Sequence, residues 1–227
     1  MKTEKIINCL FAALIVTFCS CSADAILFDE YRKEKQPVTP DEKPQITMTL
    51  TGNQLTVYLT GDGSVSIDWG DGTQTEKELE NSSTGTECKK IYSNATNRTV
   101  VISGGNITGL RCDGNQITSL DVSEITVLTS LICSDNQLSE LNVDKNTALK
   151  WFVCSDNQLS SLSLNSNTAL FFIDCQNNLF VALQLNNLFN SLHENPVSSG
   201  KTVIISGNSG ADSCDKSIAE KKGWTVE

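Results

Sequence analysis

The sequence predicts a solenoid of short parallel strands that is capped at its N-terminal end by a small antiparallel β domain. Two observations predict this fold. A 21-residue unit occurs four times within residues 105–192, and residues 45–104 alternate apolar and polar residues in short runs. A unit of this length has too few apolar residues to fold alone, so it must stack on its neighbours. The inward positions of such a stack form continuous buried columns.

The repeat unit has the frame L-x-x-L-x-C-x-x-N-x-L-x-x-L-x-V, and every apolar or asparagine position is filled in every copy. The segment CSDNQLS, for example, occurs at 133–139 and again at 154–160. The four copies begin at Ile107, Leu128, Leu149 and Leu170. Because a fixed period specifies a repeat architecture, this region is expected to be one continuous array.

Two positions of the frame are expected to form structural ladders. The apolar residue two places before each cysteine shares its orientation on a strand, so both side chains face inward. Buried cysteine packs as a small hydrophobic residue, and one straight column suits neither a zinc site nor disulfide geometry. The asparagine amides are expected to bond backbone groups of the turns that water does not reach. The ladder residues are Cys112, Cys133, Cys154 and Cys175, with Asn115, Asn136, Asn157 and Asn178.

This frame resembles the leucine-rich repeat, with cysteine at a position where most members have leucine. Phrases such as NQLSELNVDKNTAL are similar to those of cysteine-ladder internalins and of Bacteroidetes cell-envelope lipoproteins. The resemblance implies a leucine-rich-repeat solenoid of the α/β class, with a short parallel-strand sheet and a mostly irregular convex side. It also implies adhesion or scaffolding, and it offers no ligand.

The region 45–104 is expected to cap the solenoid directly, because ISGGNITGL leads into the first repeat without a linker. SIDWGDGT at 66–73 and KIYS at 90–93 resemble a PKD-type β-sandwich. Asp71 and Gly72 are predicted to make a tight turn over Trp69. Calcium binding by Asp68 and Asp71 is the alternative, as it is for Asp135 and Asp156 in the turns of the repeats.

After Leu185 the frame breaks, and apolar residues at helical spacing predict a short helix. TVIISGN at 202–208 then restores a strand and a turn, as a final coil that is nine residues longer than the others. A last helix at 213–222, capped by Ser213, and a closing strand WTVE complete the prediction. The leucine-rich repeats therefore span 105–192, and residues 193–227 form a capping repeat and helix.

The first 20 residues are typical of a lipoprotein signal peptide. Two lysines precede an apolar run at 6–18, which at about 13 residues is shorter than the ~20 that span a bilayer. FCSC at 18–21 resembles a bacterial lipobox, which implies lipidation at Cys21. Residues 21–44 are expected to tether the protein to the outer membrane of the cell envelope, on its periplasmic or its exposed side. Cleavage nearby without lipidation is the alternative.

Charge and motif content exclude several function classes. The formal net charge is −10, which repels phosphate backbones and argues against nucleic-acid binding. No phosphate-binding loop, zinc motif or nucleophile elbow occurs, so neither an enzyme nor a cofactor nor a metal site is expected. His193 is the only histidine, and we expect it to be solvated. Cys88 and Cys214 are expected to be free and buried.

The outward residues of the parallel sheet form the candidate ligand-binding face. Trp151 and Phe172 are predicted to be adjacent there, with aliphatic and charged neighbours, and such clusters are common at binding sites. The candidate residues are Trp151, Phe172, Arg111, Ile132, Val153 and Asp174. The partner of this expected monomer is a protein, or else a glycan. The alternative is that the cap or the tether covers the face.

Overall fold

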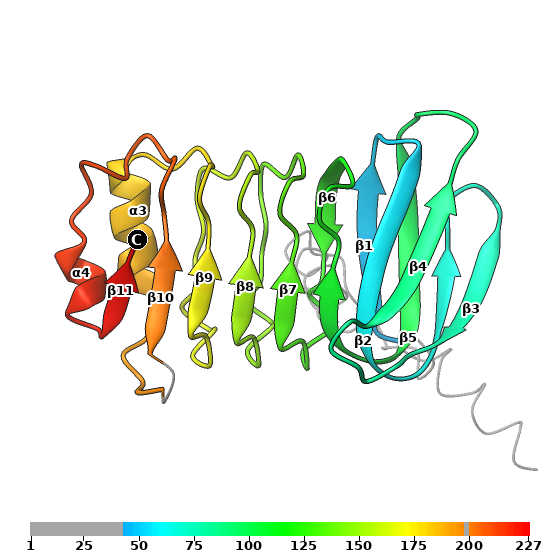
Figure 1. Ribbon diagram of the computed structural model, residues 1–227, viewed down its shortest axis with the longest axis horizontal. Helices are drawn as coiled ribbons and strands as arrows, with labels where there is room; N and C mark the ends of the chain where they lie inside the picture. Colours follow the sequence, from blue (N-terminus) through cyan, green and yellow to red (C-terminus); the bar gives the residue numbers. More distant parts are fainter. Residues whose placement is uncertain (1–42, 198–199) are drawn as a thin grey trace, which may run out of the picture. The chain divides into compact units, whose positions relative to one another are not determined.

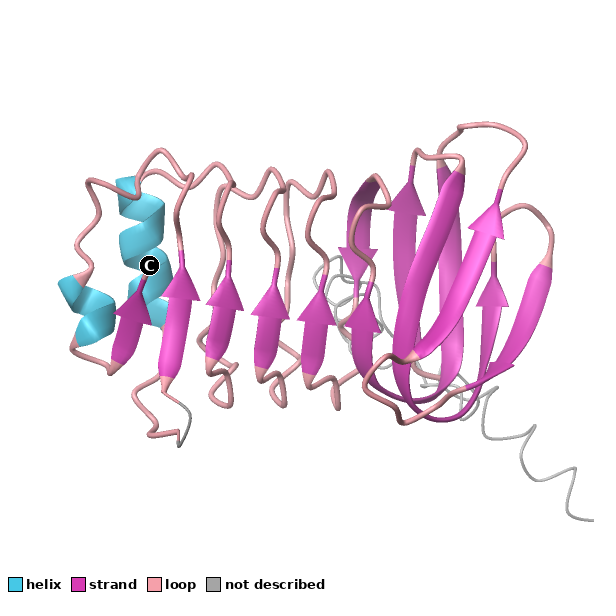
Figure 2. Cartoon of the chain, in the orientation of Figure 1, coloured by secondary structure: helices cyan, strands magenta, loops and turns pink. Residues whose placement is uncertain are grey.

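Residues 43–197 and 200–227 are described by the computed structural model, and residues 43–227 belong to one compact unit. The unit is built on a single sheet of eleven strands (Figure 1). Figure 2 shows that loops connect the strands of the repeats and that the described helices lie at the C-terminal end. The predicted repeat solenoid with an irregular outer side is confirmed at this level.

The parallel half of the sheet is formed by one short strand from each coil. It comprises the end of β5 (Arg98–Arg111), then β7 (Ser130–Ile132), β8 (Trp151–Val153), β9 (Phe172–Asp174), β10 (Lys201–Ile204) and β11 (Trp224–Val226). Neighbouring strands pair in register at Leu110, Leu131, Phe152, Ile173 and Val203. The last step is 30 residues instead of 21, which confirms the final coil with nine extra residues.

The inward cysteines form a column that is completely buried. All four ladder cysteines have no exposed surface and are free thiols, and Ile205 continues the column in the longer final coil. Each thiol is therefore a small apolar group in close-packed surroundings.

The asparagine side chains join each coil to the next. Asn136 Oδ1 accepts hydrogen bonds from the backbone N–H groups of Asn115 and Ile117, at 3.1 and 2.9 Å. Its Nδ2 donates to the carbonyl of Cys112 in the preceding coil at 2.9 Å. At the start of the array, Asn115 bonds both the N–H and the C=O of Thr56 at 2.8 Å, so the ladder continues onto the cap.

A second asparagine ladder lies on the other side of the coils. Asn146 and Asn167 are fully buried, and each Nδ2 donates at 2.9 Å to a carbonyl of the preceding coil, Val122 or Val143. Sequence analysis did not single these residues out, although NTAL repeats after 21 residues. Only two coils carry this asparagine, which is why the pattern is weak.

The cap, residues 45–104, is antiparallel. It contains β1 (Gln45–Leu50), β2 (Gln54–Asp68), β3 (Gln74–Glu78), β4 (Thr86–Ile91) and the first part of β5. From the first coil, β6 (Ile117–Asp121) adds to β1. Because β5 runs from the cap into the first coil, one strand connects the two parts.

The predicted strand order of the cap needs two corrections. Two predicted strands, at 54–61 and 64–72, are one long β2, because Gly61, Asp62 and Gly63 form an irregularity within the strand and not a hairpin. Gly63, with φ of 77°, adopts a conformation that glycine tolerates best. The strand β3 was not predicted because QTEKE has no apolar residue.

The turn at 68–73 uses its carboxylates for local hydrogen bonds. Asp68 Oδ1 accepts from Gly70 N at 2.9 Å, and Asp71 Oδ1 accepts from Thr73 N at 3.0 Å. Lys90 pairs with Asp71 at 3.1 Å, and Trp69 below the turn is only 2% exposed. Asp135 and Asp156 likewise occupy turn positions, with φ of 53° and 55°. Within 43–197 and 200–227, no three His, Cys, Asp or Glu residues gather as a metal site would require.

The C-terminal end differs from the prediction in detail. The helix α3 (Ala182–Ser191) begins before Leu185, so Leu183, which fills an inward position of the frame, is 64% exposed. The last helix, α4 (Ser217–Glu220), has only four residues, and Ser213 does not cap it. Asp215 accepts a hydrogen bond from Ser217 N instead and fixes the later start.

His193 is half-buried, so the expectation of a solvated side chain is wrong. Its Nδ1 accepts a hydrogen bond from Asn195 N at 3.1 Å, and Nε2 therefore carries the proton that it shares with the Leu170 carbonyl at 2.7 Å. The indole of Trp224 donates to the His193 carbonyl at 2.9 Å. Burial lowers the pKa of His193 below its ordinary 6.5, and Lys201 and Lys222 lower it further, while the Leu170 bond opposes them.

Acidification is expected to weaken the C-terminal end through His193. Because the folded pKa is below the unfolded value, the full contribution to stability exists above about pH 6.5 and is lost as the pH falls towards the folded pKa. Between pH 7 and 5.5 the melting temperature of His193→Gln should change less than that of the wild type. Equal slopes for the two proteins would contradict this role of His193.

Candidate functional site

The outward side chains of the parallel half form two rows, which together we call the sheet face. In-register pairing places each residue beside its equivalent in the next coil. One row is Gly109, Ser130, Trp151, Phe172 and Thr202, and the other is Arg111, Ile132, Val153, Asp174 and Ile204. All six candidate residues therefore lie on one face, as β-strand alternation requires.

Three aromatic rings form the centre of this face, and we call them the aromatic cluster. The rings of Trp151 and Phe172 stack with centroids 3.9 Å apart and planes at 12°, while Phe171 meets Trp151 edge-on at 6.0 Å and 72°. Such pairs contribute about 0.5–1.5 kcal/mol each beyond their buried area. Trp151 remains 37% exposed, so the described part of the cap does not cover the cluster.

Phe171 is the member that sequence analysis missed. It precedes β9, where strand alternation does not apply, and only the ring contact with Trp151 reveals its place. Stacking on Phe172 covers one face of the Trp151 indole. The next residue on the other side of the row is Ser130, which is too small to cover the opposite face.

Charged groups lie at the edge of the aliphatic row. Arg111 Nε is 2.6 Å from Asp113 Oδ1, and this ion pair neutralises most of its charge locally. Ile132 and Val153 are half-buried beside it. Burial raises the pKa of Asp174, and Asp156 nearby raises it further. The row thus changes from a neutralised cation to a partly desolvated carboxylate across two aliphatic residues.

A cleft opens between the cap and the sheet face, and we call it the cap cleft. Its volume is about 510 Å³, within the range of roughly 300–1,000 Å³ that is usual for ligand pockets. Tyr58, Ser83, Gly109, Arg111 and Ser130 are among its lining residues. These residues come from β2, from the loop between β3 and β4, and from β5 and β7, so no local motif in the sequence predicts the cleft.

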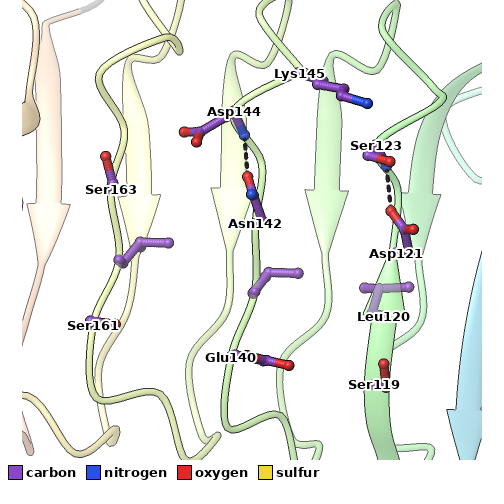
Figure 3. A pocket seen from close by; sticks show the side chains of 12 residues that line it. Ser119, Leu120, Asp121, Ser123, Glu140, Asn142, Asp144, Lys145, Ser161 and Ser163 are labelled. Carbon is purple, nitrogen blue, oxygen red and sulfur yellow. Dashed lines mark hydrogen bonds between the residues drawn. The ribbon is translucent and has the colours of Figure 1, made fainter. Parts of the chain in front are cut away.

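A second hollow, the coil groove, lies on the loops that face away from the parallel strands (Figure 3). Its volume is about 610 Å³, and equivalent positions of three coils line it, such as Ser119, Glu140 and Ser161. Asp121 and Asn142 are held there by hydrogen bonds to backbone N–H groups two residues later. No aromatic side chain lines this groove.

The ladder cysteines do not form a reactive site. Burial raises the pKa of Cys133 and of Cys175 to about 12, and that of Cys112 and Cys154 well above the ordinary value. These thiols are therefore protonated at neutral pH, whereas a nucleophile or a metal ligand needs the thiolate. Cys88 is free and buried as expected, but Cys214 is free and only partly buried.

Comparisons with known proteins place the chain near one kind of repeat structure. No protein-family model and no curated protein matches it. Among solved structures, it is similar to the functional domain of InlJ from Listeria monocytogenes, which is described as including a cysteine ladder. The two are 26% identical, the match covers 53% of this chain, and the TM-score is 0.41. The match covers only 25% of the InlJ chain, whereas the cysteine and asparagine ladders described above are properties of this chain itself.

Proposed function

We propose that this chain is a non-enzymatic recognition module that binds another protein through its sheet face, in adhesion or scaffolding. The observation that carries the proposal is the aromatic cluster, which stays exposed although it has apolar neighbours on the same face. Exposed aromatic side chains with aliphatic neighbours and a polar rim are typical of protein interfaces. Stacking orders the rings before binding, which reduces the entropy that binding would cost.

The charges around the face favour a partner with basic side chains. Asp135 and Asp156 are exposed in the turns that follow β7 and β8, and the whole chain carries a formal charge of −10. Complementary charge mainly accelerates association and suppresses incorrect partners. A basic, partly apolar protein surface therefore fits this face better than an acidic one.

The chemistry of the described residues also favours binding over catalysis. His193 is engaged by Leu170 and Asn195, and the ladder thiols are protonated. Neither group lies on the sheet face. The arrangement offers surface complementarity instead of an acid, a base or a nucleophile.

Anchoring to the cell envelope is part of this proposal and depends on the N-terminal sequence. The signal at 1–20, the lipidation residue Cys21 and the tether at 21–44 lie outside the described residues, except for Lys43 and Pro44. Intact-mass analysis of the protein extracted from membranes tests lipidation, since an unmodified mature chain would contradict it. Protease treatment of intact cells distinguishes the exposed side from the periplasmic side.

Double replacement of Trp151 and Phe172 by alanine is expected to abolish capture of the protein partner in pull-down experiments. The melting temperature should fall only slightly, because both rings pack on the surface of a sheet whose core is unchanged. The matched control is Leu179→Ala with Leu183→Ala, which removes two exposed apolar side chains elsewhere. Unaltered capture by the aromatic variant, or equal loss in the control, would contradict the proposal.

A further inference from the structure

The cap cleft has a floor that is shaped by one row of the sheet face. In that row, side-chain size increases away from the cap, from Gly109 through Ser130 to Trp151. A Cβ at Gly109 would come within 3.2 Å of Thr60 Cβ, so glycine allows close packing here and leaves the floor open. The cleft is therefore low beside the cap and ends at an indole.

The outer wall of the cleft is the loop between β3 and β4. Gly85 ends this loop with φ of 70°, and a Cβ there would come within 3.0 Å of the Leu59 carbonyl. Its N–H donates to the Ser82 carbonyl at 3.2 Å, which turns the loop tightly. The loop is thus held close to β2, with its hydroxyl groups beside the floor of the cleft.

Hydroxyl groups dominate the lining. Seven of the twelve lining residues are serine or threonine. The hydroxyls of Thr60, Ser83 and Ser130 make no hydrogen bond to any part of the chain that the structure describes. A hydroxyl can both donate and accept, so this lining suits a ligand that is itself rich in hydroxyl groups.

The backbone of the floor is not available for pairing with a peptide strand. At this level β5 lies between β2 and β7, with Thr60 opposite Gly109 on one side and Ser130 opposite Gly109 on the other. Recognition of an extended peptide by strand addition needs an open sheet edge. The cleft therefore disfavours that mode of binding.

Aromatic groups flank the floor at both ends. Tyr58 lines the cleft on the cap side, and its hydroxyl donates to Glu87 at 3.1 Å. On the other side is the indole face of Trp151 that Phe172 leaves uncovered. Flat apolar rings beside hydroxyl groups match a sugar ring, which has apolar C–H faces and polar edges.

The charge of the lining favours a neutral ligand. No carboxylate lines the cleft, and its one cation, Arg111, is paired with Asp113 outside the lining. The coil groove, by contrast, is lined by Asp121, Glu140 and Asp144 and has no aromatic wall. Of the two hollows, the cap cleft alone combines neutral hydroxyl groups with rings.

From these observations we propose that the cap cleft binds a neutral oligosaccharide, with the uncovered face of Trp151 as its stacking surface. This is a second binding activity beyond protein recognition. It occupies the junction of the cap with the first coils and needs no contact with Phe172 or Asp174. A saccharide and a protein partner would therefore compete only where both contact Trp151.

Tryptophan fluorescence provides a direct readout. The chain has three tryptophans, and Trp69 and Trp224 are each 2% exposed, so a soluble quencher reaches Trp151 preferentially. The probes are neutral di- to tetrasaccharides of glucose, xylose, mannose and N-acetylglucosamine, added to the purified full chain. At least one probe should bind saturably and protect Trp151 from iodide quenching.

The decisive variant is Ser130→Tyr, which fills the floor of the cleft. The frame tolerates a large ring at this position, as Trp151 and Phe172 show, so the variant should fold with an unchanged melting temperature. Binding should weaken about tenfold or more. Ser161→Tyr, in the coil groove, is the matched control and should bind normally.

Three outcomes would overturn the saccharide site. No probe binds saturably, only acidic saccharides bind, or binding survives Ser130→Tyr while Ser161→Tyr abolishes it. Capture of a protein partner is measured separately with the Trp151 and Phe172 double variant. Loss of one activity therefore leaves the other proposal standing.

Discussion

Replacing Asn157 by alanine is expected to destabilise the solenoid by roughly 2–5 kcal/mol, because it leaves several buried backbone groups without partners. Asn157 Oδ1 accepts from Leu138 N at 2.9 Å, and Nδ2 donates to the carbonyls of Cys133 and Cys154 at 3.0 and 3.2 Å. Water cannot replace these bonds while the coils are stacked. Urea unfolding followed by circular dichroism measures the change in the free energy of unfolding.

The matched control for this variant is Asn142→Ala. Asn142 is an exposed asparagine of the same region, and its side chain makes one local bond, from Asp144 N at 2.8 Å. Its replacement should change the free energy of unfolding by less than about 0.5 kcal/mol. If the two variants unfold at the same urea concentration, the asparagine ladder does not hold the coils together.

The repeat half of the fold follows from the sequence because its pattern is periodic. A 21-residue spacing defines which residues share a column, and in-register pairing of Leu131 with Phe152 realises it. The longer final coil is also readable, since Val203 and Asn208 keep their places in the frame. Period fails where its evidence is short, as for Asn146 and Asn167, which recur only once.

The cap and the ends of the chain depend on contacts that local sequence does not encode. GDG at 61–63 has the composition of a hairpin turn, yet pairing with β5 on both sides keeps it within β2. His193 has polar neighbours in sequence, and it is covered by Trp224 from the closing strand. Long-range packing determines both outcomes.

The candidate site was predictable in part. Alternation on short strands places Trp151 and Phe172 on the same face, and the structure adds their stacking and the third ring of Phe171. The cap cleft could not be predicted, because Tyr58, Ser83 and Ser130 meet only when β2, β5 and β7 pair. A site assembled from three distant segments leaves no spacing signal.

The account rests on the claim that the ladder cysteines are packing residues. Ionisation alone predicts a large effect, since a thiol with a pKa of about 12 instead of 9 reacts about a thousandfold more slowly at neutral pH. Exclusion of the reagent from a fully buried column slows the reaction further. Cys214, which is only partly buried, should react first.

The most direct measurement is the rate of thiol modification in the folded protein. A chain that starts at Ser22 lacks Cys9, Cys19 and Cys21, so only the six described cysteines remain. We expect one thiol, Cys214, to react promptly under native conditions and all six to react in denaturant. Rapid modification of the four ladder thiols in the folded chain would contradict the buried column and the solenoid built around it.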